Sequence, residues 1–191
     1  MGLLTKTYLS EKAQKSSGFM TESYVRASSA EKLLNFANTA TASEAFDIFL
    51  SHSREDAILI KGLRDELTDL GFRVYVDWIE DPQLDRSNVT ADTAAQLRSR
   101  MRQAKCLLFA TSEAAKKSVW MPWELGYMDG HQNSRVAIAP MVEDHQAGGE
   151  FKGQEYLGLY PYLDKTGTTL YIHKSASKYV RFSDWLDGKD P

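Results

Sequence analysis

The chain has few of the features that mark secreted, membrane or metal-binding proteins. A single cysteine, Cys106, stands among 191 residues, so no disulfide can form within the chain. The longest apolar run, Val136–Val142, is too short to cross a bilayer, and the apolar start Met1–Leu4 is too short for a signal peptide. The four histidines are scattered without the spacing of metal ligands. We therefore expect a cytoplasmic protein without a bound metal.

A strong net charge and the common phosphate and hydrolase motifs are also missing. The 23 basic and 26 acidic residues are interspersed and give a net charge of −3, so we expect neither nucleic acid nor a membrane as a partner. Lys6 stands where a myristoylation signal requires Ser or Thr. No Walker sequence, glycine-rich phosphate loop or GxSxG elbow occurs, which disfavours phosphoryl transfer and serine hydrolysis.

From Phe46 onward, short apolar runs alternate with stretches of helical periodicity. The strand-like runs lie at 46–50, 72–76, 105–110 and 136–142. The helical stretches lie at 60–70, 94–101 and around Glu124. This alternation predicts an α/β fold that is doubly wound, with a mainly parallel sheet and helices on both faces. A last strand at 169–173 and a short helix at 181–186 would close the domain.

The first part of the chain differs in composition from the rest. It is rich in Ser, Thr, Ala and Lys and has only a short amphipathic stretch around residues 31–36. We therefore expect residues 1–43 to form a partly helical N-terminal extension outside the core, and residues 44–187 to form one domain.

Polar residues follow each of the first three predicted strands. They are Ser51–Ser53, Asp77–Trp78 and Thr111–Ser112. Ligands of open parallel sheets bind beyond the carboxyl ends of the strands. We therefore expect these residues to meet at one edge of the sheet and to form a binding site there.

Residues 118–128 set one carboxylate, Glu124, among aromatic and apolar side chains. Trp120 precedes it by four positions and Tyr127 follows it by three, so a helix would place all three on one face. Pro122 is tolerated only in the first turn of a helix, where partial positive charge favours an ionised carboxylate. Such an anion could stabilise a developing cation on a sugar. Alternatively, the helix packs its aromatic residues in the core and Glu124 is a solvated charge.

Four segments, taken in order, resemble the Toll/interleukin-1 receptor (TIR) domain family. They are Phe46–Asp56 (FDIFLSHSRED), Gly71–Asp77 (GFRVYVD), Cys106–Ser112 (CLLFATS) and Trp120–Glu124 (WMPWE). The resemblance spans about residues 45–143 and implies a flavodoxin-like fold. The loop at 81–90 lacks the Gly- and Pro-rich pattern of receptor TIR domains, and Pro122 stands where many members carry Cys or polar residues.

Members with a WxxxE element on the third helix cleave NAD, so the resemblance implies that Glu124 is catalytic. It implies NAD as a substrate without any cofactor. The candidate substrate-binding residues are Ser51, His52, Ser53, Tyr75, Asp77, Trp78 and Trp120. The loop at 81–90 corresponds to a segment through which TIR domains associate, which predicts self-association.

The chain is also similar to free-standing bacterial TIR enzymes of Thoeris antiphage defence. That similarity implies a signal, either ADP-ribose or a cyclic ADP-ribose isomer, and a downstream effector that senses a cyclic nucleotide product. Two other functions stay open. A non-enzymatic TIR module would only assemble with other TIR domains, and a nucleoside (deoxy)ribosyltransferase would share the edge site and the single carboxylate.

Overall fold

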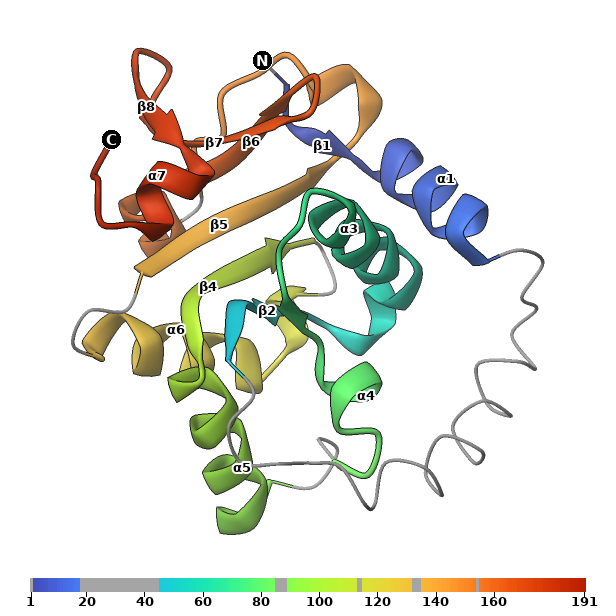
Figure 1. The fold of residues 1–191 in the computed structure, drawn as a ribbon, viewed down its shortest axis with the longest axis vertical. Coiled ribbons are helices and arrows are strands. Elements are labelled where there is room, and N and C mark those ends of the chain that lie inside the picture. The colour runs from blue at the N-terminus through green and yellow to red at the C-terminus, as the bar shows by residue number, and fades with distance from the viewer. Residues whose placement is uncertain (1, 18–44, 85–88, 113–114, 132–134, 154) are drawn as a thin grey trace.

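The computed structural model of the chain describes residues 2–17, 45–84, 89–112, 115–131, 135–153 and 155–191, within which a central sheet of eight strands forms (Figure 1). The strands are β1 (Leu4–Thr5), β2 (Phe46–Ser51), β3 (Val74–Tyr75), β4 (Ala104–Thr111), β5 (Arg135–Val142), β6 (Tyr162–Thr166), β7 (Thr169–Ser175) and β8 (Lys178–Arg181). The α-helices are α1 (Lys6–Ser17), α3 (Ala57–Asp69), α4 (Asp77–Glu80), α5 (Ala91–Arg102), α6 (Trp120–Gly130) and α7 (Phe182–Leu186).

The order of the strands fixes where a ligand can bind. The sheet runs β3-β2-β4-β5-β6-β7-β8, and the strands along the path β3-β2-β4-β5-β6 pair in parallel. The chain winds outward from β2 to β3 on one side and to β4 on the other. In open α/β sheets ligands bind at such a change of direction, which here lies beyond the carboxyl ends of β2 and β4. The predicted doubly wound, mainly parallel fold is confirmed.

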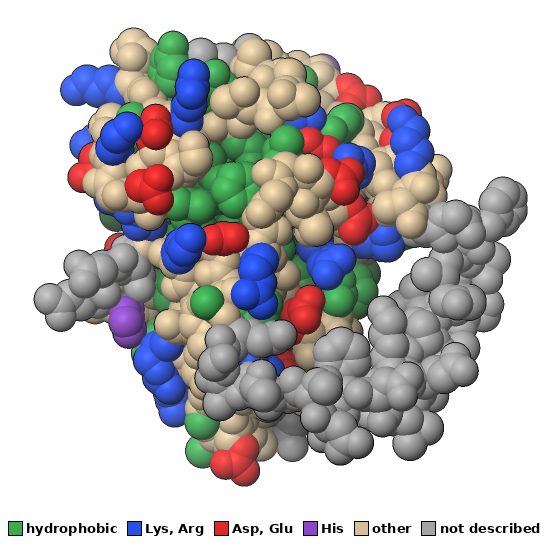
Figure 2. Space-filling view, viewed as in Figure 1, with side chains coloured by type: hydrophobic (Ala, Val, Ile, Leu, Met, Phe, Trp, Pro, Cys, Tyr) green, Lys and Arg blue, Asp and Glu red, His purple; other side chains and the backbone are tan. Residues whose placement is uncertain are grey.

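Two hydrophobic cores lie on opposite faces of the sheet. One core joins the strands to α1, α3 and α7 through residues such as Leu9, Leu63 and Trp185. The other joins them to α5 and α6 through Met101 and Leu125. Figure 2 shows hydrophobic side chains gathered between α7 and α3 in the upper half of the view, with charged side chains around them. The helices therefore cover both faces, as the sequence predicts.

Helix α3 shows how local sequence sets these elements. Ile60, Leu63 and Leu67 recur at helical spacing, and each is fully buried against the sheet. The helix stops at Gly71, whose φ of 92° is strained for any residue with a Cβ. The amide of Gly71 donates to the carbonyl of Thr68, and the amide of Phe72 donates to that of Leu67. This turn delivers the chain directly into β3.

The N-terminal residues are part of the core, so the expectation of an extension outside it is wrong for residues 2–17. Strand β1 pairs in parallel with the end of β5, and Gly2 exchanges two backbone hydrogen bonds with Lys165 of β6. Helix α1 then packs on α3. At their contact an ideal Cβ on Gly62 would lie 1.9 Å from the carbonyl oxygen of Leu9. Residues 18–43 lie outside the described residues, and the domain boundary at 43/44 stays a prediction.

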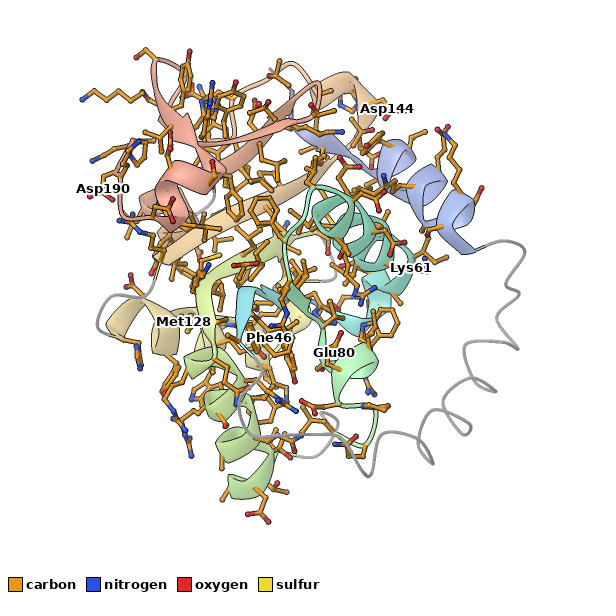
Figure 3. The ribbon with its side chains drawn as sticks, viewed as in Figure 1. Phe46, Lys61, Glu80, Met128, Asp144 and Asp190 are labelled. Atoms are coloured by element: carbon orange, nitrogen blue, oxygen red, sulfur yellow. The ribbon has the colours of Figure 1, made fainter. Side chains whose placement is uncertain are left out.

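Polar contacts also hold the N-terminal segment against the rest of the fold. Glu66 of α3 is 4% exposed and contacts the hydroxyl of Tyr8 and the ammonium groups of Lys12 and Lys165. At the start of α1, Thr7 donates to Asp144, which follows β5 (Figure 3). Burial alone would raise the pKa of Glu66, but hydrogen bonds from Lys165, Tyr8 and Lys12 outweigh it and lower the pKa. Glu66 is therefore an ionised group that joins three parts of the chain.

The C-terminal part holds more strand than the sequence indicated. The predicted strand at 169–173 is β7, and the predicted closing helix is α7. Strands β6 and β8 were not predicted, and β7 is antiparallel to both. Between them, His173 stacks between the rings of Tyr162 and Tyr179 at centroid distances of 5.2 and 4.9 Å. This antiparallel end extends the parallel sheet on the side away from β3.

Candidate functional site

The end of β2 brings a serine against the predicted carboxylate. The Ser51 hydroxyl donates to Oε2 of Glu124 over 2.6 Å. Both residues have no solvent-exposed surface. Ser51 pairs with Phe109 of β4 in the sheet, so the contact lies near the carboxyl ends of β2 and β4. The two residues stand 73 positions apart in the chain, and the fold alone brings them together.

Helix α6 begins at Trp120, which puts Pro122 in its first turn and Glu124 at its fifth residue. The Ser118 hydroxyl accepts a hydrogen bond from the amide of Met121, a group that the first turn leaves unpaired. Trp120 is 7% exposed and meets Trp123 edge to face at 5.4 Å. The solvated-charge interpretation of Glu124 is wrong, since the carboxylate is buried.

His52 connects β2 to the start of α4. Its Nδ1 lies 2.8 Å from the carbonyl oxygen of Leu50, and its Nε2 accepts from the indole N–H of Trp78 over 3.1 Å. A carbonyl only accepts and an indole N–H only donates, so the tautomer with a proton on Nδ1 satisfies both contacts. Oδ1 of Asp77 lies 3.2 Å from Nε2 and accepts the amide of Trp78. His52 and Asp77 are each 2% exposed, whereas Trp78 is half-buried.

Tyr75 of β3 packs its ring inside the molecule and holds the residue that follows α4. It is fully buried, its ring stacks on Phe49 at 5.0 Å, and its hydroxyl donates to Asp81 over 2.8 Å. Burial, followed by the charge of Asp81, raises the pKa of Tyr75 above its usual range. Its hydroxyl therefore remains a neutral donor that holds Asp81.

Asp81 and Arg100 form a pair that sequence reasoning missed. Arg100 of α5 donates from Nε and Nη2 to the two carboxylate oxygens of Asp81, over 2.8 and 2.7 Å. Asp81 is 2% exposed, so this bidentate pair is largely shielded from water. It fixes the start of the loop at 81–90, of which residues 85–88 lie outside the described residues. No local pattern links the two residues, because they are 19 positions apart and lie on different elements.

The remaining hydroxyls at this edge are used by the backbone and by neighbours. Ser53 accepts from the amide of Glu55 over 3.3 Å and caps a short 3-10 turn at Arg54–Asp56. Ser112 contacts Asp56 and accepts from the amide of Ala115. The ends of β2 and β4 are therefore joined, as the expectation of a shared edge requires.

The arrangement can hold one carboxylate rigidly beside aromatic groups. Cys106, by contrast, lies fully buried in β4, where burial raises the pKa of its thiol and disfavours the reactive thiolate.

Among the described residues, no three His, Cys, Asp or Glu side chains are placed to hold a metal ion. The same part of the chain contains no helix that is both long and apolar enough to cross a membrane.

Comparisons with known proteins identify the family. The model of the TIR domain matches residues 48–170. A protein of Bacillus cereus (strain MSX-D12) named "Probable 3' cyclic ADP-D-ribose synthase ThsB'" is 51% identical over 150 residues, which are 75% of this chain and 77% of that protein. A protein of Cytobacillus dafuensis named "Putative cyclic ADP-D-ribose synthase TIR2" is 30% identical over 92 residues, which are 48% of this chain and 24% of that protein.

Proposed function

Since this chain belongs to the TIR domain family, we propose that it is an enzyme that cleaves NAD and releases nicotinamide. The observation that carries the proposal is the buried Glu124, which the Ser51 hydroxyl holds near the carboxyl ends of β2 and β4. The relative from Bacillus cereus, named for the synthesis of 3' cyclic ADP-D-ribose, supports it independently.

One carboxylate suffices for this reaction. Ordinary glycosidases need a second carboxyl group that protonates the leaving oxygen. Nicotinamide instead departs from a positively charged pyridinium nitrogen and leaves as a neutral molecule, so no general acid is needed. The remaining task is to stabilise the positive charge that develops on the ribose and to hold its hydroxyls. A preorganised anion such as Glu124 performs both tasks, without any cofactor or metal.

We further propose that the product is 3' cyclic ADP-D-ribose, the compound in the name of the 51% identical relative. Attack by water would give linear ADP-ribose, whereas attack by a group of the same molecule gives a cyclic isomer. Cyclisation requires a folded substrate and exclusion of water. The half-buried ring of Trp78 and the nearly buried ring of Trp120 are suited to enclose flat bases.

Access to Glu124 requires a movement, because neither it nor Ser51 has exposed surface. We propose that self-association through the loop at 81–90 provides it. The pair between Asp81 and Arg100 anchors the start of this loop close to α4, which carries Asp77 and Trp78. Activity per molecule should then rise with protein concentration, and Arg86→Glu should reduce that rise while Arg86→Lys preserves it. Constant specific activity across a wide dilution series would contradict self-activation.

The biological setting that fits this activity is antiphage defence of the Thoeris type, in which a downstream effector senses the cyclic product. A cytoplasmic location fits as well, since NAD is abundant there. A defence system of this kind requires an enzyme that is inactive at rest. The shielded carboxylate in the structure is consistent with a resting state of that kind.

The test of the proposal is to incubate the purified protein with NAD at high concentration and to separate the products by chromatography. We expect free nicotinamide and a second product that is one water lighter than ADP-ribose by mass spectrometry. Nicotinamide with linear ADP-ribose alone would retain the NAD cleavage and overturn the cyclic product. No nicotinamide in concentrated, associated protein would favour a non-enzymatic assembly module. Base exchange with free nucleosides would favour a nucleoside (deoxy)ribosyltransferase.

A further inference from the structure

Ser51 has a hydroxyl whose hydrogen-bond partner is the proposed catalytic group rather than solvent. Sequence reasoning made Ser51 a candidate for direct contact with the substrate. In the structure its hydroxyl donates to Oε2 of Glu124 over 2.6 Å, and both side chains are completely buried. At 2.6 Å the bond lies at the short end of the usual range for an O–H donor and an oxygen acceptor.

The two elements that carry the pair are fixed independently of each other. Ser51 is the last residue of β2, and its backbone is held by pairing with β4. Glu124 lies near the start of α6, whose neighbours Met121, Leu125 and Met128 are buried in the second core. A hydrogen bond between two such anchored groups restricts the rotamers of the carboxylate.

The chemistry of this bond matches the proposed reaction. A ribose hydroxyl and a serine hydroxyl are the same kind of donor, and a carboxylate has two oxygens with about four lone-pair sites. Once the proposed movement has given the substrate access, Glu124 can therefore accept a ribose hydroxyl while Ser51 keeps its hydrogen bond to Oε2. The bond also orients the charge before the substrate arrives, which is the condition under which an anion stabilises a transition state most effectively.

We infer that Ser51 is a positioning residue, which holds the Glu124 carboxylate in the orientation that stabilises the ribosyl cation and does not itself bind NAD. This inference rests on the proposed NAD cleavage. It predicts a loss in turnover rather than in affinity, because the bond to Glu124 matters most when charge develops on the ribose.

Two substitutions separate the hydrogen bond from the space that the side chain fills. Ser51→Ala removes the hydroxyl, and Ser51→Cys fills a similar volume with a weak donor. We expect kcat to fall about 10- to 100-fold in Ser51→Ala, with Ser51→Cys between it and the parent, and KM for NAD to stay within about twofold. Ser51→Thr, which keeps the hydroxyl, should restore kcat. The control is Ser16→Ala, which removes an exposed hydroxyl of α1 that donates to the carbonyl of Ala13, and it should retain kcat.

A rise in KM with unchanged kcat would overturn the inference and make Ser51 a substrate contact. Full kcat in Ser51→Cys would also overturn it, since packing alone would then explain the side chain. Thermal unfolding of every variant identifies those that are folded at the assay temperature. If Ser51→Thr does not fold, the comparison of Cys with Ala decides.

A double-mutant cycle on stability tests the contact without any activity. Ser51→Ala, Glu124→Gln and their combination should shift the urea midpoint non-additively if the two side chains interact as in the structure. If the midpoint shifts are non-additive but the parent releases no nicotinamide, the proposed function is contradicted and the contact between Ser51 and Glu124 is supported. Additive shifts with unchanged kcat in Ser51→Ala would contradict the inference and leave the proposed function standing.

Discussion

Two buried glutamates, Glu66 and Glu124, show how differently this fold can use a shielded carboxylate. Glu66 is 4% exposed and contacts two lysines and a tyrosine that come from α1 and β6. Glu124 has no exposed surface, and its Oε2 accepts from the neutral hydroxyl of Ser51. The first cluster lies on the face of the sheet covered by α1 and α3. The second lies at the carboxyl ends of the strands.

The difference predicts separate roles for the two carboxyl groups. Opposite charges around Glu66 compensate the loss of water, and without Glu66 the ammonium group of Lys165 loses its contact with a carboxylate, whereas Lys12 keeps its contact with Asp69. The Ser51 hydroxyl orients Glu124 without adding a charge, which suits a group that is proposed to stabilise positive charge on a substrate. Substitutions at the two sites should therefore separate stability from activity.

The largest effect is expected from Glu66→Ala, which leaves Lys12 and Lys165 without their shared carboxylate. We expect a loss of about 3 kcal/mol in the free energy of unfolding, measured by urea denaturation at neutral pH. The rate of NAD cleavage per folded molecule should be unchanged. Glu11→Ala is the matched control, because Glu11 is exposed on α1 and should cost little. Equal losses in the two variants would show that the Glu66 cluster does not tie α1 and β6 to α3.

Glu124→Gln should reduce activity rather than stability, the opposite of Glu66→Ala. It keeps the shape of the side chain and removes the charge, so nicotinamide release should fall by about 100-fold or more, equivalent to roughly 2.7 kcal/mol of transition-state stabilisation. The control is Asp129→Asn, which removes an exposed carboxylate from the same helix. Parent-like turnover in a Glu124→Gln protein with a native circular dichroism spectrum would mean that the charge has no catalytic role.

Gly62→Ala should disturb the contact between α1 and α3 near Glu66 and leave the site around Glu124 unchanged. The added Cβ would lie 1.9 Å from the carbonyl oxygen of Leu9, so α1 must move away from α3. We expect a loss of about 1–3 kcal/mol in stability, without a change in NAD cleavage per folded molecule. Gly126→Ala is the matched control, since nothing lies within 4 Å of its ideal Cβ. At this exposed position of α6 it should stabilise the helix by about 0.5–1 kcal/mol. A tolerated Gly62→Ala would mean that α1 does not pack closely on α3 in solution.

The same contrast explains which parts of the fold the sequence could predict. The runs that became β2, β4 and β5, and the periodicity of α3, α5 and α6, are local patterns that burial on both sides of a sheet imposes. Strand β1 has two residues and exists only because β5 pairs with it, so no local pattern could reveal it. Strand β6 mixes buried Tyr162 and Leu163 with Asp164 and Lys165, which breaks the alternation expected of a strand.

The candidate site divides in the same way. The local segment around Glu124 and the polar residues after β2 and β3 are the patterns from which the sequence predicts a site. The bonds from Ser51 to Glu124 and from Trp78 to His52 depend on long-range packing, so their donors and acceptors could not be assigned from sequence. For the same reason, the sequence could not show that Tyr75, predicted to bind the substrate, is fully buried and donates its hydroxyl to Asp81. Its part in substrate binding, like that of the other candidates, stays a prediction.

The smallest expected effect is at Asp164, a further buried carboxyl group. Its pKa is raised, whereas that of Glu66 is lowered. Burial raises the pKa of Asp164 above its ordinary 3.8, and the charge of His173 offsets this only in part. Among the described residues, Oδ1 of Asp164 and Nε2 of His173 are buried without a hydrogen-bond partner, and Oδ2 lies 4.0 Å from that nitrogen. The ionised form of Asp164 is therefore disfavoured in the folded protein.

These opposite shifts predict opposite dependences on pH. Glu66 has a lowered pKa, so its contribution to stability is present above the unfolded value near 4.5 and is lost as the pH falls through the folded pKa. Asp164 has a raised pKa, so its contribution is present below the unfolded value near 3.8 and is lost as the pH rises through the folded pKa. Urea midpoints measured between about pH 3 and pH 7 test this. Relative to the parent, Asp164→Asn should become more stable as the pH rises, whereas Glu66→Gln should become less stable. The amide that Asp164→Asn introduces can also donate to His173, which adds to the gain at neutral pH. Parallel midpoint curves for both variants would show that neither carboxylate is shifted in the folded state, and the contrast between compensated and uncompensated buried charge would then fail for this protein.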